Sequence, residues 1–176
     1  MGGQLDASVR LLPPGSFAFV MATGIVSTAF HIIKASTISQ FLLVVAVVGL
    51  AILTVAYIWR LIAFRGDLAR DVREPGRAFG FFTVVAGINV VGIRLYSSDA
   101  SKITITLALI AIPIWLILTY ALPGILILRP RNTPVSTEIN GSWFLWVVAT
   151  QSLAAVAAVI GHDRESELIS AVAVGM

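Results

Sequence analysis

The chain has 176 residues, of which 58% are hydrophobic and only 12% charged, and its formal net charge is +3. Soluble domains carry about 25% charged residues, so this chain lacks the charge to coat a water-facing surface, and we expect a membrane protein. The 12 Lys and Arg residues fall in connecting segments, which excludes a nucleic-acid-binding patch, and the absence of cysteine excludes disulfides, thiolate metal sites and thiol catalysis.

Five uncharged runs are long enough to cross a bilayer, because a spanning helix needs about 20 mostly apolar residues. They predict an all-α polytopic membrane protein with spans at residues 16–33, 41–59, 78–94, 103–128 and 142–160. The first run follows a Pro-Pro-Gly sequence and is expected to be helical from Ser16. The fourth contains Pro113 and Pro123, which predict a bent or early-ending helix.

The end of the chain is harder to interpret. After the fifth run comes a charged connector, residues 161–167, and then nine apolar residues, 168–176. Nine residues are too few to cross a bilayer as a helix. A frayed amphipathic tail is one interpretation. We favour the other, in which residues 1–176 are a single transmembrane domain that is truncated at the start of a sixth span.

The distribution of Lys and Arg predicts the orientation, because cytoplasmic connectors carry an excess of both. Eight lie on one side and four on the other: Arg10, Arg60, Arg65, Arg70, Arg73, Arg77, Arg129 and Arg131 against Lys34, Arg94, Lys102 and Arg164. We therefore expect a multi-pass protein of the cell (plasma) membrane with a cytoplasmic N-terminus. The arginine-rich connector 65–77 also contains three acids and is expected to be solvated, with an anion-gathering mouth as the alternative.

Odd- and even-numbered spans differ in composition. Spans two and four are almost purely aliphatic and aromatic, which suits contact with lipid, whereas spans one, three and five carry small and polar residues. Many of these residues recur at three- and four-residue spacing and so share one face of their helix. Such faces are explained either by close helix packing or by a central conduit. Under the second interpretation, the lining residues are Ser16, Thr23, Ser27, Gly80, Thr83, Gly87 and Thr150.

A weak internal repeat favours the conduit. Each odd span opens with a turn dipeptide, continues through aromatic residues and reaches a small residue about two turns later. The turn glycines Gly15, Gly76 and Gly141 recur at nearly equal intervals, each about one helical hairpin with its connectors. A hairpin with a polar inner helix and an apolar outer helix, repeated around an axis, can enclose a pore, and internal repeats are common in transporters.

The three openings together resemble those of the tellurite-resistance/C4-dicarboxylate transporter family, which includes the slow anion channels of plant guard cells and fungal malate and sulfite carriers. The resemblance is carried by residues 14–27 (PGSFAFVMATGIVS), 77–89 (RAFGFFTVVAGIN) and 140–152 (NGSWFLWVVATQS). It implies five helical hairpins around a pseudo-fivefold pore, with odd helices inside, even helices outside and frequent assembly as homotrimers. This chain supplies five of those ten helices. The family's gating phenylalanine lies on the ninth helix, so Phe79, Phe81 and Phe82 do not inherit its role.

The resemblance implies a channel or transporter for small anions, either C4-dicarboxylates such as malate or inorganic anions and oxyanions, including tellurite-related species. The residues agree with it. The five runs contain hydroxyls and amides but no Asp, Glu, Lys or Arg, which favours passive permeation over proton-coupled exchange. Arg94, at the outer end of the third span, either snorkels to water or attracts anions.

Two other classes of function are weaker. An intramembrane enzyme needs convergent His, Asp or Glu groups, but His31 and His162 lie at span ends without an acidic partner at helical spacing. We therefore expect no enzyme, no metal site and no cofactor. An accessory or scaffolding membrane subunit, or a non-functional fragment, is the remaining alternative. The Thr and Ser stripes on the odd helices count against it.

Overall fold

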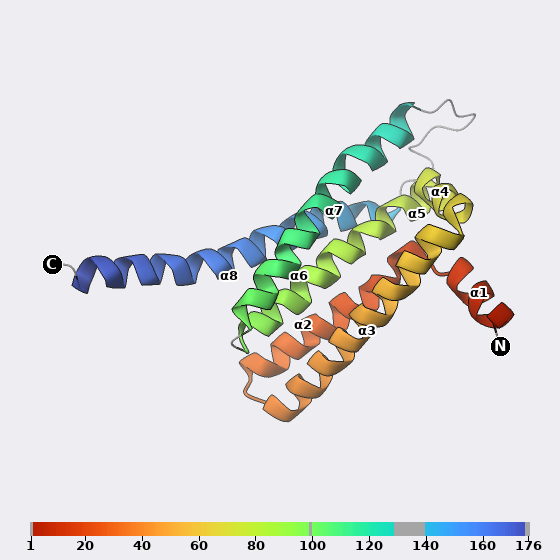
Figure 1. Ribbon diagram of the computed structural model, residues 1–176. Coiled ribbons are helices and arrows are strands. Elements are labelled where there is room, and N and C mark those ends of the chain that lie inside the picture. Colours follow the sequence, from red (N-terminus) through yellow and green to blue (C-terminus); the bar gives the residue numbers. More distant parts are fainter. Residues whose placement is uncertain (1, 99, 129–139, 175–176) are drawn as a thin grey trace.

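The computed structural model describes the backbone of residues 2–98, 100–128 and 140–174, and the side chains of these residues except 2–5 and 163–174. Within them every regular element is a helix, which confirms the predicted all-α class. The α-helices are α1 (Gly2–Arg10), α2 (Ala18–Ile32), α3 (Ser36–Ala63), α4 (Arg65–Arg73), α5 (Pro75–Ala78), α6 (Phe82–Tyr96), α7 (Ser101–Leu128) and α8 (Phe144–Val174) (Figure 1). Short 3-10 turns, η1 (Pro14–Phe17), η2 (Phe79–Phe81) and η4 (Gly141–Trp143), precede α2, α6 and α8.

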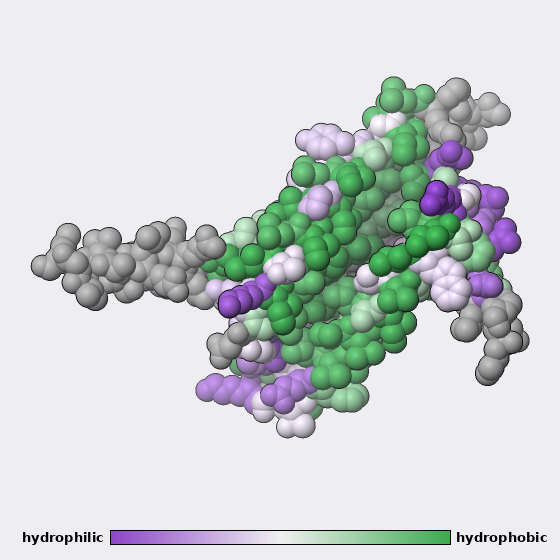
Figure 2. All heavy atoms as spheres, viewed as in Figure 1, coloured by the Kyte–Doolittle hydropathy of each residue, from purple (hydrophilic) through white to green (hydrophobic). Residues whose placement is uncertain are grey.

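Five helical stretches are long and apolar enough to cross a membrane, which confirms the expected number of spans. They are Pro14–Ile32, Ser36–Ala63, Pro75–Tyr96, Ser101–Leu128 and Gly141–His162. Figure 2 shows a broad apolar belt between two polar ends, one around α4 and the other at the turn between α2 and α3. We call the first of these the arginine-rich end. Arg129 and Arg131, which contribute to the predicted orientation, lie outside the described residues.

Two helices depart from what the sequence suggested. Helix α7 ends at Leu128, the predicted end of the fourth span, and continues through Pro113 and Pro123. Of the two expected outcomes, a bent or an early-ending helix, the early end does not occur. The carbonyl that a proline frees in a membrane helix can be shielded by neighbouring helices and local adjustment, and the helix can therefore continue. Helix α8 runs as one helix through residues 161–167, where a connector was expected. A sixth span beginning at 168–176 stays a prediction, because the side chains there lie outside the described residues.

Helix α6 is the centre of the bundle. It packs against α2, α7 and α8, and more lightly against α3. In its most apolar stretch 78% of the residues are buried, compared with 6% in α3 and 17% in α7. The interior helix is thus a span rich in small and polar residues, and the exposed ones are the aliphatic spans that suit lipid. Helices α2 and α8 are also largely uncovered, with 22% and 17% of their most apolar stretches buried, because in the described residues they flank α6 on its two sides.

The three turns that open the odd spans lie next to one another. Turn η2 contacts both η1 and η4. A Cβ atom on Gly80 would be 2.9 Å from the backbone nitrogen of Gly15 and 3.1 Å from Pro14 Cβ. On the other side, the carbonyl of Gly76 accepts hydrogen bonds from Ser142 Oγ and Asn140 Nδ2, each 3.4 Å long. The repeated sequence therefore builds one continuous contact at the arginine-rich end.

The substitution Gly80→Ala should destabilise the protein, because the new methyl group would meet backbone atoms of η1 that cannot move aside. Overpacking of this kind costs about 1–3 kcal/mol. The matched control is Gly124→Ala in α7, where nothing lies within 4 Å of the added carbon and helix propensity improves. Thermal unfolding in detergent measures both variants. Equal unfolding midpoints would contradict the close contact between η1 and η2.

Candidate functional site

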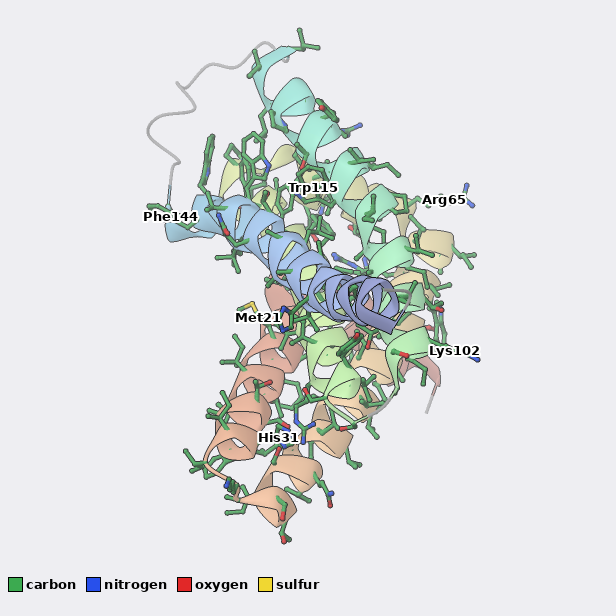
Figure 3. The ribbon with its side chains drawn as sticks, turned by 90° about the vertical axis from the view of Figure 1, so that its left-hand side faces the viewer. Met21, His31, Arg65, Lys102, Trp115 and Phe144 are labelled. Carbon is green, nitrogen blue, oxygen red and sulfur yellow. The ribbon has the colours of Figure 1, made fainter. Side chains whose placement is uncertain are left out.

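Helices α2, α6 and α8 form a row, which we call the inner arc. Helix α3 packs mainly on α2, and α7 mainly on α6, so both lie on the outer side of this row. Figure 3 shows Met21 of α2 and Phe144 of α8 on the side opposite Arg65 and Lys102. This inner side is the candidate wall of an anion path, because it belongs to the spans that carry the predicted polar faces.

The three predicted lining residues of the third span are all buried in helix contacts. Gly80 lies against η1, and Gly87 lies 3.6 Å from Val20 of α2, measured from the position of an added Cβ. Thr83 is 1% exposed, and its hydroxyl donates to the carbonyl of Gly80 at 2.7 Å and approaches that of Pro14 at 3.4 Å. These contacts favour the packing interpretation of the stripe on α6. A role in lining a conduit stays a prediction for these residues.

The predicted residues of the first span lie near α3 or the chain entering α2. Ser27 is completely buried, and it exchanges two hydrogen bonds of 2.7 Å with Ser39 of α3, each hydroxyl donating to the other's carbonyl. The Ser16 hydroxyl donates to the carbonyl of Pro13 at 2.7 Å. Thr23 is half-buried. Of these three residues, Ser27 is the one whose hydroxyl joins α2 to α3.

Thr150 of α8 is exposed and faces the outer helix α7. Its hydroxyl accepts a 3.0 Å hydrogen bond from Trp115 Nε1 of α7 and donates to the carbonyl of Trp146 at 2.9 Å. It also lines an apolar groove of about 590 Å³ between α7 and α8. Of the predicted residues, the structure brings Gly80 and Thr83 together at η1, whereas Thr150 belongs to a separate contact.

The inner side of α2 is formed by residues that sequence patterns did not identify. Gly24 contacts Val90 of α6 and Ser27 contacts α3, which fixes the rotation of α2 about its axis. By helical geometry, Met21 and Ile25 lie one turn apart, beyond Gly24 and away from Ser27. Ile25 is 51% exposed, and Figure 3 places Met21 on the inner side. No small or polar residue type marks these positions, so only helix packing identifies them.

One amide lies between α6 and α8. Asn89 is completely buried, and its Nδ2 donates a 2.9 Å hydrogen bond to Ser152 Oγ, which in turn donates to the carbonyl of Ala149. The Oδ1 atom of Asn89 has no partner among the described residues. A buried polar atom without a partner costs about 1–3 kcal/mol, so a water molecule in the wall of the arc is its natural partner.

Arg94 does not reach water as a snorkelling side chain would. It is only 2% exposed, although it lies near the end of its span. All three guanidinium nitrogens donate: Nη2 and Nε to Ser39 Oγ at 2.8 and 3.3 Å, and Nη1 to Ser98 Oγ at 2.9 Å. The expectation that its head snorkels is therefore wrong, because Ser39 of α3 and Ser98 of the turn after α6 replace water around it. Attraction of anions by Arg94 stays a prediction.

Aromatic side chains fill the space between α6 and α8 at the arginine-rich end. Phe79 stacks on Trp143 with ring centroids 4.4 Å apart, and Phe82 stacks on Trp146 at 6.2 Å. Phe79 and Phe82 are almost completely buried. Their role in this chain is to seal the contact between two odd spans.

The connector at residues 65–77 is folded rather than freely solvated, because α4 lies against the end of α3. Asp71 and Arg60 are each 2% exposed and form a 2.6 Å ion pair. The Asp67 carboxylate lies 2.7 Å from Arg10 Nε and 3.5 Å from Arg70. The hydrogen bond from Arg10 lowers the pKa of Asp67 below its usual value. The expected solvated segment is thus a small ion-pair network.

Ser39→Ala should destabilise the bundle, because it leaves two guanidinium nitrogens of Arg94 without an acceptor and removes a bond to α2. A buried charged donor without a partner costs about 2–3 kcal/mol. The measurement is the thermal unfolding midpoint in detergent. Ser36→Ala, at an exposed position of the same helix, is the control and should change little. A midpoint for Ser39→Ala equal to that of Ser36→Ala would show that Arg94 finds its partners elsewhere.

Comparison with known proteins gives one match. The family model described as voltage-dependent anion channel matches residues 11–176, which include all five spans. No curated protein and no solved structure gives a significant match.

Proposed function

This chain belongs to the voltage-dependent anion channel family, and on that premise we propose that it conducts small anions passively along the inner side of the arc of α2, α6 and α8. It is a membrane protein of a family of channels and transporters rather than of enzymes. The observation that carries the proposal is the order of the helices. Small-residue contacts join α2 to α6, a hydrogen bond and stacked aromatic rings join α6 to α8, and the aliphatic spans cover the outer side of this row.

The electrostatics of the arc support passive anion movement. A carboxylate in the wall would repel the permeant ion, and a titratable group at mid-membrane would indicate proton coupling. The inner side of α2 carries Met21 and Ile25, and the contact with α8 carries the neutral pair Asn89 and Ser152. Asn89 and Ser152 are neutral but buried in that contact, and Met21 and Ile25 present apolar surface. These four residues add no fixed charge to the inner side, which fits weak selectivity among small anions.

The finer parts of the proposal follow the resemblance. We include C4-dicarboxylates such as malate and inorganic anions or oxyanions, among them tellurite-related species, as candidate permeants. We also include assembly of several copies as a homotrimer, a location in the plasma membrane and a cytoplasmic arginine-rich end. The excess of arginine at that end supports the orientation, because positive connectors remain in the cytoplasm.

Single-cysteine variants test the path, because the chain has no cysteine and each variant then carries one reactive thiol. Ile25→Cys should react with a water-soluble methanethiosulfonate reagent and lose most of its anion flux in liposomes, since a thiol is reactive only where water lets it ionise. The matched control is Ile52→Cys on the lipid-exposed side of α3, where the native side chain is 63% exposed. This control should neither react nor lose flux.

The unmodified chain treated with the same reagent controls for non-specific effects on the liposomes. Equal labelling of the two cysteines, or full flux after complete labelling of Ile25→Cys, would count against a path along the inner arc. Flux no greater than that of empty liposomes would instead favour the accessory-subunit alternative.

A further inference from the structure

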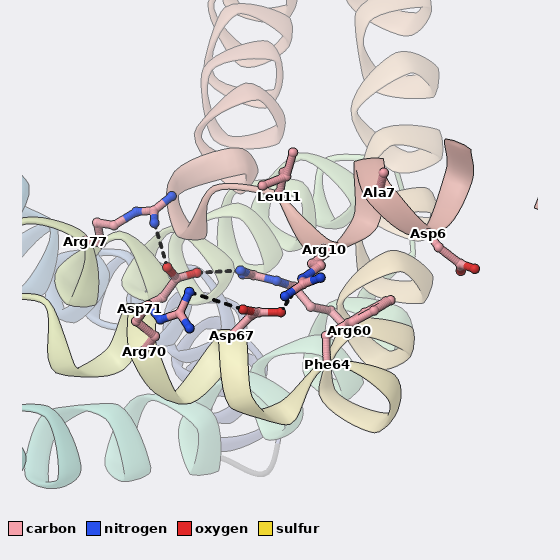
Figure 4. A pocket seen from close by; sticks show the side chains of 10 residues that line it. All are labelled: Asp6, Ala7, Arg10, Leu11, Arg60, Phe64, Asp67, Arg70, Asp71 and Arg77. Carbon is pink, nitrogen blue, oxygen red and sulfur yellow. Dashed lines mark hydrogen bonds and ion pairs between the residues drawn. The ribbon is translucent and has the colours of Figure 1, made fainter. Parts of the chain in front are cut away.

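A cavity of about 530 Å³ lies at the arginine-rich end, between α1, the end of α3, α4 and α5 (Figure 4). Its charged lining residues are Arg10, Arg60, Arg70, Arg77, Asp6, Asp67 and Asp71. None of the surrounding helices belongs to the inner arc, so the cavity is separate from the proposed anion path. It lies beside α3, where the apolar side chains of Ile58 and Ile62 are exposed.

The ion pairs in the cavity leave the arginines in excess. Asp71 is shared by Arg60 at 2.6 Å and Arg77 at 2.8 Å, as Figure 4 shows. In the same way, Asp67 is shared by Arg10 and Arg70. Each carboxylate thus serves two guanidinium groups. Arg77 also lies 3.8 Å from Glu74, so these networks join four arginines to three acids, an excess of one positive charge.

Arg60, the most buried arginine of the cavity, has N–H donors without an acceptor. Arg60 is 2% exposed, its Nη2 atom donates to the carboxylate of Asp71, and the Tyr57 hydroxyl lies beside its guanidinium group. Its Nε and Nη1 atoms are buried and have no hydrogen-bond partner among the described residues. A charged group buried in this way is strongly disfavoured unless further acceptors complete its shell. The position therefore calls for an acceptor with several lone pairs and a negative charge.

We propose that this cavity binds a phosphate group. A phosphate carries up to two negative charges and has oxygens on several sides, so it can accept from Arg60 and from the more exposed Arg10 and Arg70 together. Arginine is suited to this task because its planar donor fork matches the oxygens of a phosphate. The group is either a free phosphate or the headgroup of an anionic phospholipid, since basic pockets at the cytoplasmic ends of membrane helices bind such headgroups.

Binding of inorganic phosphate to the purified full chain in detergent tests the site. The measured quantity is the rise in the thermal unfolding midpoint in phosphate, compared with the midpoint in chloride at the same ionic strength. Arg60→Lys keeps the charge and the partner Asp71 but removes the planar fork. Arg70→Gln removes the guanidinium group of a side chain that is 76% exposed and contributes little to folding. Each should raise the dissociation constant for phosphate about tenfold or more, because each removes a charge-assisted hydrogen bond of the arginine fork to the phosphate. The matched control, Arg65→Gln, is exposed on the same helix and outside the cavity, and should bind like the original chain.

A second arm distinguishes the source of the phosphate. The same proteins are placed in nanodiscs of phosphatidylcholine with or without phosphatidic acid, and the lipid that remains bound after extraction is measured by mass spectrometry. Retention of phosphatidic acid by the original chain and Arg65→Gln, with loss in Arg60→Lys, identifies a lipid headgroup. Stabilisation by inorganic phosphate alone identifies the free ion.

Two results would overturn the proposal. One is that neither inorganic phosphate nor phosphatidic acid binds the original chain. The other is that Arg60→Lys and Arg70→Gln bind both ligands as tightly as Arg65→Gln does. Because the readout is binding rather than flux, these outcomes are independent of whether the inner arc conducts anions.

Discussion

The structure depends on how polar groups are satisfied where no water is available. Inside hydrocarbon, helices gain nothing from hiding apolar surface from one another, so small residues and hydrogen bonds decide which helices meet. Three of the main helix contacts of this bundle have such a bond, and a fourth, between α2 and α6, is made through Gly24 and Gly87. Ser27 joins α2 to Ser39 of α3, Thr104 of α7 donates to the carbonyl of Gly92 in α6 at 2.7 Å, and Asn89 of α6 donates to Ser152 of α8. Helix α6 takes part in two of these three bonds, which explains why it is the interior helix.

The number of spans could be predicted from the sequence because it requires only the lengths of apolar runs, and five such runs give five helices. Helix ends could not be predicted as well. Helix α3 extends from Ser36 to Ala63, beyond the predicted 41–59, because a helix does not stop where the apolar run stops. Arg60, the first residue after the apolar run, stays in the helix, and its charge is paired with Asp71. Helix α7 likewise continues through Pro113 and Pro123, because a proline weakens a helix but neighbouring helices can compensate.

The candidate site was only partly predictable, because packing and lining use the same residue types. A stripe of Gly, Ser and Thr is equally suited to a close helix contact and to a wetted wall. In α6 the stripe is buried in the contact with η1 and α2, where Thr83 and Gly87 have no free surface. The surface left on the inner side of α2 then falls to Met21 and Ile25, which have no distinguishing residue type. Which side of a helix is free depends on its neighbours, and a single sequence with weak repeats does not specify the rotation of each helix.

The arginines show the same ambiguity in another form. By sequence, Arg60 and Arg94 are both cations at span ends, and both are buried in the folded chain. Every guanidinium nitrogen of Arg94 donates a hydrogen bond to Ser39 or Ser98, so this side chain joins α6 to α3. Arg60 has one satisfied nitrogen out of three. The difference follows from charge bias at the two ends. The orientation of the protein in the membrane favours an end that carries many arginines, and such an end has fewer carboxylates than guanidinium groups. Because each carboxylate is then shared between two arginines, some guanidinium N–H groups are left without an acceptor. The excess of arginine that directs insertion into the membrane therefore also allows the arginine-rich end to bind an external anion.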